Sequence, residues 1–227
     1  MLTLIIIAVI LFMVFGGDPN FGKRHNFEES YNNNLKADAP ELYNDLKIVA
    51  SLAPESEEKY GLLKTNIEGF NIAFKENDKQ KIIEIVLCMD MNFGQDNEDE
   101  DAPSYSFPFL VAAMRAIDSG FNEKALDFTS NMFNVCIDDS AKFTHAHAQY
   151  LIADAQGGDQ SQMDAAIEGM HQTYNPQKNF IYEDNFYTVT ADYGDFYKND
   201  KWNVKIRVMK KSTVEKLAKA ANGQNAQ

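Results

Sequence analysis

The sequence predicts a mostly α-helical chain of stacked antiparallel helical hairpins, with a small C-terminal β-hairpin and a short helix, preceded by one N-terminal membrane helix. Three observations support this fold class. The chain has 227 residues and opens on the apolar run MLTLIIIAVILFMVFGG. From Pro40 to Asn175 apolar residues recur at steps of three and four, which is the period of an amphipathic helix. After Pro176 the pattern changes to aromatic and β-branched residues, which are typical of strands.

Residues 1–17 form the first predicted unit, a transmembrane anchor or signal segment. A transmembrane helix needs about 17–25 apolar residues, and this run carries no charged side chain. Positive charges beside a membrane segment tend to stay in the cytoplasm, and Lys23 and Arg24 follow the run. We therefore expect a single-pass anchor with a cytoplasmic C-terminal domain, held by the apolar side chains of Leu4, Ile6, Val9, Leu11 and Phe15. The alternatives are an export signal, either cut after Gly16 or retained, and a segment buried in a larger complex.

Residues 18–39 are predicted to be a polar linker, because the stretch is rich in asparagine and shows little periodicity. A helical-repeat domain is predicted over residues 40–175. Its first helices cover residues 41–52, 54–75 and 79–91, each with apolar side chains on one face. Asn77 and Asp78 supply the turn before the third helix.

The stretch GQDNEDEDAP at residues 94–103 is strongly acidic. A calcium-binding EF-hand loop needs ligands at alternating positions and a central glycine, and this stretch lacks that spacing. We interpret it as a solvated loop, with a weak site for a divalent cation or a basic partner as the alternative. More helices are predicted over residues 107–120, 122–135, 141–155 and 160–174, where Asn175 and Pro176 give a stop signal.

The C-terminal part, residues 176–222, is predicted to be a small β-hairpin followed by a short helix. Its strands are expected within FIYEDNFYTVTADY at 180–193 and WNVKIRVM at 202–209, the second of which alternates apolar and polar residues. The helix is expected from Ser212 to Ala221, and residues 223–227 form a disordered tail.

Three short turns, each followed by an amphipathic helix, recur along the helical region. Ile82, Ala125 and Ala165 hold equivalent places, 43 and 40 residues apart, and such self-similarity is typical of stacked helical hairpins. The middle copy combines glycine, aromatic, acidic and small residues in a fixed order: Gly120, Phe121, Glu123, Ala125, Leu126 and Phe128, with Ala113 twelve positions before Ala125. This pattern resembles a tetratricopeptide repeat, mainly over residues 107–174, although the family's own period is shorter. The resemblance implies a concave scaffold for protein partners, and an unrelated helical bundle is the alternative.

Composition narrows the classes of function. The net charge of −13 and the isoelectric point near 4.7 argue against nucleic-acid binding, because phosphate recognition needs clustered lysine and arginine. The two cysteines, Cys88 and Cys136, lie in apolar surroundings and are interpreted as buried thiols. A disulfide between them is expected only if the chain is exported.

The sequence indicates no catalytic residues, no cofactor and no metal site. His145 and His147 lie two residues apart, so on a helix they point in different directions and do not share one metal ion. His147 with Asp154, or with His171 of the next helix, would be closer to a ligand pair, but neither a Cys-x-x-Cys nor a His-Glu-x-x-His motif supports a zinc site. We interpret these histidines as polar surface or interface residues.

Aromatic residues of the C-terminal part are the predicted contact with a partner. Tyrosine and tryptophan dominate the energetics of protein interfaces, and the candidate residues here are Tyr182, Phe186, Tyr187 and Trp202. Other aromatic residues of the same region are expected to fill the core of the hairpin.

These observations lead to two main hypotheses of function. The first is a membrane-anchored helical-repeat protein that serves as an interaction scaffold or accessory subunit, bound to protein partners in a membrane complex and to lipid through residues 1–17. The second is an exported envelope, surface or viral structural protein with a signal segment. An enzyme with an unrecognised site around His145, His147 and the acidic stretch is a third and weaker reading.

Overall fold

In the computed structural model, which describes residues 20–56, 59–90, 105–155, 157, 160–173, 177–192 and 203–224, the main feature is one antiparallel sheet. Seven strands of the described residues form it, in the order β1-β2-β3-β4-β7-β6-β5. The strands are β1 (Ala50–Leu52), β2 (Gly61–Lys64), β3 (Asn71–Glu76), β4 (Ile82–Asp90), β5 (Lys178–Tyr182), β6 (Asn185–Asp192) and β7 (Asn203–Lys210). An N-terminal and a C-terminal meander are thus joined where β4 pairs with β7.

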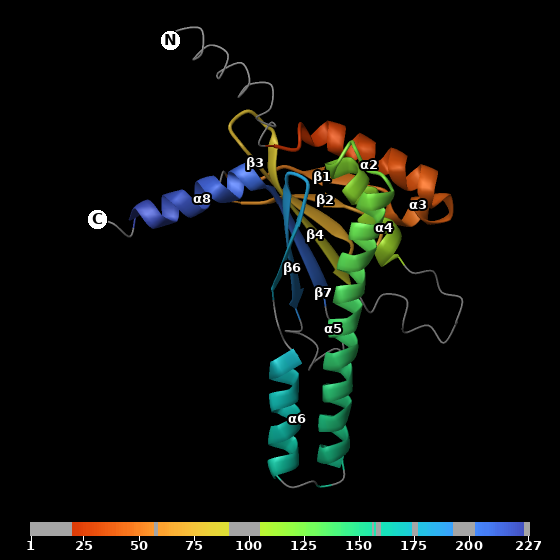
Figure 1. Ribbon diagram of the computed structural model, residues 1–227. Helices are drawn as coiled ribbons and strands as arrows, with labels where there is room; N and C mark the ends of the chain where they lie inside the picture. Colours follow the sequence, from red (N-terminus) through yellow and green to blue (C-terminus); the bar gives the residue numbers. More distant parts are fainter. Residues whose placement is uncertain are drawn as a thin grey trace.

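Helices lie against one face of this sheet (Figure 1). The helices of the described residues are α2 (Arg24–Asp38), the 3-10 helix η1 (Pro40–Leu42), α3 (Tyr43–Leu46), α4 (Ser106–Ile117), α5 (Glu123–Ala155), α6 (Gln160–Thr173) and α8 (Lys211–Gln224), and α2, α4 and the first part of α5 form this layer. The first part of α5 packs beside the sheet, and the helix then continues past the sheet and pairs with α6 (Figure 1). Helix α8 leaves the end of β7 and projects away from both the sheet and the helix layer (Figure 1).

The core lies between the sheet and helices α2 and α4. Phe74, Ile85, Val208 and Tyr187 are cross-strand neighbours on four strands, and all of them are fully buried. Across the layer, Phe109 of α4 meets two other buried rings edge-on, with centroids 5.9 Å from Tyr31 and 5.5 Å from Phe70. Full burial of a large apolar side chain stabilises a fold by about 1.5–3 kcal/mol, so this layer accounts for most of the hydrophobic stabilisation.

Residues 24–38, expected as part of a polar linker, form helix α2 instead. Phe27, Tyr31 and Leu35 repeat at four-residue steps and are buried against α4 and the sheet. The Tyr31 hydroxyl donates a hydrogen bond to the Leu46 carbonyl at 3.0 Å, and burial raises the pKa of Tyr31. The Asn32 side chain bonds both backbone groups of Ile48, accepting from its N–H at 2.8 Å and donating to its carbonyl at 3.4 Å. These bonds tie α2 to the chain that enters β1.

The prediction of stacked helical hairpins, and with it the resemblance to a tetratricopeptide repeat, is wrong. Residues 50–90 hold four strands where helices were predicted over 41–52, 54–75 and 79–91. The apolar run IIEIVLCMD forms β4 and not the predicted helix, because a short buried run has no period that separates the two states. Its β-branched residues Ile82, Ile83, Ile85 and Val86 favoured a strand.

The turn at Asn77 is correctly placed but joins two strands. The Asn77 side chain accepts hydrogen bonds from the backbone N–H groups of Lys79 and Lys81, both at 3.0 Å. Gln80 takes a positive φ of 56°. An asparagine that bonds the backbone two residues ahead is a turn device of hairpins as well as of helical connections, which is why the sequence did not distinguish them.

Other elements agree with the prediction. Helices α4, α6 and α8 lie close to the expected ranges, and β6 and β7 form the expected C-terminal hairpin. Two predicted helices over 122–135 and 141–155 are one continuous helix, α5. The hairpin is not a separate small unit, because β7 also pairs with β4 inside the larger sheet.

The described residues contain no helix that is both long and apolar enough to cross a lipid bilayer. This finding counts against the predicted single-pass membrane protein, and we withdraw that localisation. The expected anchor residues Leu4, Ile6, Val9, Leu11 and Phe15 lie outside the described residues.

Candidate functional site

The candidate site is the face of the sheet opposite the helix layer, which we call the uncovered face. Side chains alternate across a strand, so Ile85, Leu87 and Met89 point to the helices while Glu84, Val86 and Cys88 lie on the uncovered face. The helix layer lies on the other side of the sheet, and α8 leaves the end of β7 and projects away from the sheet (Figure 1). The outer strands leave large apolar side chains in solvent there, with Leu52 48% and Ile181 59% exposed.

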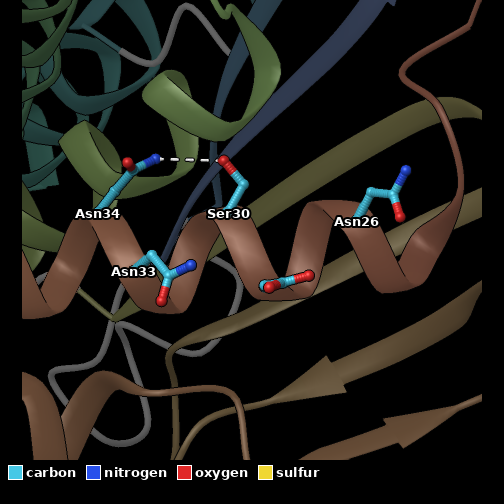
Figure 2. Close-up of a pocket in the computed structure, with 5 residues that line it drawn as sticks. Asn26, Ser30, Asn33 and Asn34 are labelled. Carbon is cyan, nitrogen blue, oxygen red and sulfur yellow. Dashed lines mark hydrogen bonds between the residues drawn. The ribbon is translucent and has the colours of Figure 1, made fainter.

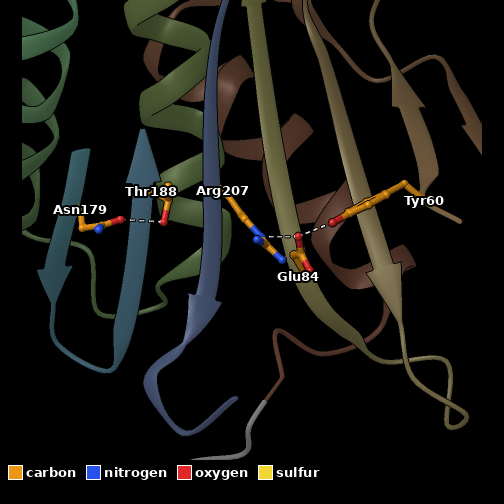
Figure 3. A network of polar contacts seen from close by, with 5 residues as sticks. All are labelled: Tyr60, Glu84, Asn179, Thr188 and Arg207. Atoms are coloured by element: carbon orange, nitrogen blue, oxygen red, sulfur yellow. Dashed lines mark hydrogen bonds and ion pairs between the residues drawn. The ribbon is translucent and has the colours of Figure 1, made fainter. Parts of the chain in front are cut away.

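A polar network crosses the uncovered face (Figure 3). Tyr60, at the entry to β2, donates a hydrogen bond from its hydroxyl to Glu84 Oε1. The same oxygen forms an ion pair with Arg207 of β7, whose Nε lies 2.5 Å away. The Glu84 side chain is 7% exposed and that of Arg207 44% exposed, so the carboxylate is enclosed and the guanidinium reaches solvent.

The network raises the pKa values of Tyr60 and Arg207. Burial, followed by the hydrogen bond to Glu84 and its negative charge, raises the pKa of Tyr60 to about 12. The hydrogen bond to Glu84 raises the pKa of Arg207 as well. Tyr60 therefore stays neutral and Arg207 charged near neutral pH, so neither exchanges a proton there. The arrangement presents a fixed cation rather than an acid or a base.

Arg207 keeps hydrogen-bonding capacity beyond Glu84. A guanidinium carries five N–H donors in a planar fork that suits carboxylates, and Glu84 occupies Nε. Arg207 is the cross-strand neighbour of Thr188 on β6, and Thr188 is the cross-strand neighbour of Asn179 on β5. The Thr188 hydroxyl donates a hydrogen bond to Asn179 Oδ1 at 3.0 Å. The row continues the polar strip to the edge of the sheet (Figure 3).

Cations lie around Arg207 on the same face. In the next cross-strand row, Lys205 is the direct neighbour of Cys88, and Lys64 of β2 follows on the other side beyond Asn71 of β3; both lysines are exposed. Burial raises the pKa of the free Cys88 thiol, and the charge of Lys205 opposes that shift. The thiol is half-buried, and the side chain of Cys136 lies outside the described residues.

The four aromatic residues predicted to bind a partner do not form one surface. Tyr187 is fully buried in the core, and Tyr182 stacks on Phe128 of α5 with ring centroids 4.9 Å apart. Phe186 is half-buried on the uncovered face, beside Met209. Trp202 lies outside the described residues. Strand alternation separates Phe186 from its neighbour Tyr187, so the predicted cluster is divided between two faces.

The residues considered for metal binding are only partly described. His145 and His147 belong to α5 and His171 to α6, but their side chains lie outside the described part, as does the acidic stretch at 94–103. Within the residues that the structure does describe, no three histidine, cysteine or carboxylate side chains are close enough to hold a metal ion.

A hollow lies on the solvent side of α2 (Figure 2). It measures about 400 Å³ and is lined by Asn26, Glu29, Ser30, Asn33 and Asn34. The Asn34 side chain donates to the Ser30 hydroxyl at 3.5 Å, which occupies part of its hydrogen-bonding capacity. The lining is polar throughout and comes from one helix, so it lacks the apolar wall that ligand pockets share.

Comparisons with protein-family models, with curated proteins and with solved structures gave no match. The uncovered face is therefore interpreted from its own chemistry. Sequence reasoning missed Tyr60, Glu84 and Arg207, although the alternation in VKIRVM already placed Lys205 and Arg207 on one face of a strand.

Proposed function

We propose that this chain is a non-catalytic protein-interaction domain, an accessory or scaffold subunit, whose uncovered sheet face binds an acidic segment of a protein partner. The observation that carries the proposal is the position of the Arg207 guanidinium. It is paired with the enclosed Glu84 carboxylate, which also accepts a hydrogen bond from Tyr60, yet the Arg207 side chain is 44% exposed. A cation fixed in this way loses little conformational entropy on binding a carboxylate.

The distribution of charge supports an acidic partner. The whole chain has a net charge of −13, yet residues 203–224 carry six cations and a single carboxylate, Glu215. Opposite potentials across an interface steer association and favour the right partner. A strongly acidic protein that concentrates cations on β7 and α8 is therefore suited to an acidic partner.

A protein partner fits this face better than a nucleic acid does. Leu52, Val86, Phe186 and Ile181 intersperse apolar area with the cations, and apolar contact at the centre with charge around it is typical of protein interfaces.

Site-specific photo-crosslinking in the full chain, made in the cells that encode it, tests the proposal. p-Benzoylphenylalanine is placed at Ile181 on the uncovered face, and at Leu126 of α5 as a control with 39% exposure. We expect a discrete protein adduct at 181 and none at 126. The adduct should decrease about tenfold in the double variant Lys64→Glu, Lys205→Glu, because two attractive charges become repulsive.

A matched double variant, Lys79→Glu and Lys124→Glu, changes the net charge equally at exposed positions away from the uncovered face. It should leave the adduct unchanged. An adduct insensitive to both double variants, or one that contains nucleic acid, would contradict the proposal.

A further inference from the structure

Helix α8 is supported by the rest of the fold only at its start. Its main contacts within the described part of the chain are with β6 and β7, and from Glu215 to Ala220 every side chain is exposed. Leu217 is 54% exposed. A helix of 14 residues is marginal in water without tertiary packing, so a helix that stands away from the body needs another surface to hold it.

The sequence of α8 has the pattern of a docking helix. Val214, Leu217 and Ala218 follow the i, i+3, i+4 spacing and share one side of the helix, whereas Lys216 and Lys219 lie on the other. Val214 is half-buried near the sheet, and the stripe becomes exposed toward Leu217. An amphipathic helix that presents such anchors commonly lies in an apolar groove of a partner.

A second copy of the chain is a poor occupant for this stripe. In such a dimer α8 of one copy would lie on the uncovered face of the other. Helix α8 carries Lys211, Lys216 and Lys219 against Glu215, and the uncovered face carries Lys64, Lys205 and the exposed part of Arg207. Two surfaces with the same sign of charge repel, so neither surface covers the other.

The uncovered face and α8 both combine apolar side chains with cations, so both suit an acidic partner, and α8 continues directly from β7. We propose that the acidic partner of the uncovered face also receives α8, in an apolar groove with an acidic rim that covers Val214, Leu217 and Ala218. This inference rests on the proposed function, and it extends the interface from the sheet to the projecting helix. An anionic lipid surface is the less suitable occupant, because the stripe has no aromatic residue and only one leucine to insert.

Photo-crosslinking from α8 tests the inference in the same full chain. p-Benzoylphenylalanine is placed at Leu217 on the stripe and, as the control, at Lys216 on the other side of the helix. We expect the protein captured from position 217 to be the one captured from position 181, with at least about fivefold less from position 216. Leu217→Asp should reduce capture from position 181 about tenfold, since one interface spans both surfaces.

The outcomes separate the two proposals. Capture from position 181 that persists unchanged in Leu217→Asp, with none or a different protein captured from 217, overturns the role of α8 and leaves the uncovered face intact. Absence of capture from both positions overturns both. Flotation with vesicles of phosphatidylserine and phosphatidylcholine is the third readout: binding that Leu217→Asp abolishes assigns α8 to lipid and overturns its docking to a protein.

Discussion

The two faces of the sheet are built from the same strands but differ in burial and in chemistry. On β4, Leu87 is fully buried under the helix layer, while the adjacent Val86 is half-buried on the uncovered face next to Arg207. The covered face is continuous and apolar, and the uncovered face mixes apolar side chains with an ion pair. A period of two therefore lets one short stretch of sequence specify both a core and a recognition surface.

The largest expected effect separates neighbouring residues of β4. Leu87→Ala should lower the free energy of unfolding by about 2–5 kcal/mol, because it leaves a cavity in a packed layer. Val86→Ala, one residue away on the uncovered face, should cost about 1 kcal/mol or less, since its side chain is already in part solvated. Urea unfolding of both variants measures the difference. Equal losses would show that the two faces are buried alike.

Arg207→Ala should produce the next largest loss. It leaves the enclosed Glu84 carboxylate with Tyr60 as its remaining partner. Removing one member of a buried pair costs about 3–5 kcal/mol, but solvent screens the half-exposed guanidinium, so we expect about 1–2 kcal/mol. Lys205→Ala, exposed on the same strand and face, is the control and should stay within about 0.5 kcal/mol. A loss from Lys205→Ala as large as that from Arg207→Ala would remove the special role of the network.

Tyr60→Phe should cost about 1 kcal/mol or less at neutral pH, since it removes one hydrogen bond to a carboxylate at a residue that is partly exposed. The effect should depend on pH. Folding raises the pKa of Tyr60 from its ordinary value of 10.0 to about 12, so the folded state favours the protonated hydroxyl. The stabilisation is complete below about pH 10 and is lost as the pH rises through 12. Urea unfolding of the wild type and of Tyr60→Phe across this range should show their difference shrinking; a constant difference would contradict the network.

Leu217→Ser on α8 should give the smallest effect on folding, within about 0.5 kcal/mol, because the side chain is exposed. Thermal unfolding followed by circular dichroism is the measurement. Leu63→Ser, a fully buried position on β2, serves as the positive control. A marked loss from Leu217→Ser would mean that α8 belongs to the stable core.

The elements that the sequence predicted well are those with one clear period. The alternation in VKIRVM gave β7, and the stripe of Phe109, Ala113 and Ile117 gave α4. Phe27, Tyr31 and Leu35 of α2 also recur at a helical spacing, but the many asparagines around them favoured a linker over a helix. Glu84 and Arg207 are far apart in sequence and meet only because β4 and β7 are neighbours. Strand order depends on the packing of the whole chain, so no local pattern predicted the network.

Strand β7 lies in the interior of the sheet, between β4 and β6, although it is the last of the described strands in the sequence. Its pairing with β4 joins Asp90 to Asn203 across the whole of α4, α5, α6 and the β5–β6 hairpin. Closing so long a loop is entropically costly, and such non-local pairing slows folding. During synthesis, the edge of β4 that pairs with β7 therefore has no strand partner until β7 has left the ribosome. We expect this interval to be when the nascent chain depends most on chaperones.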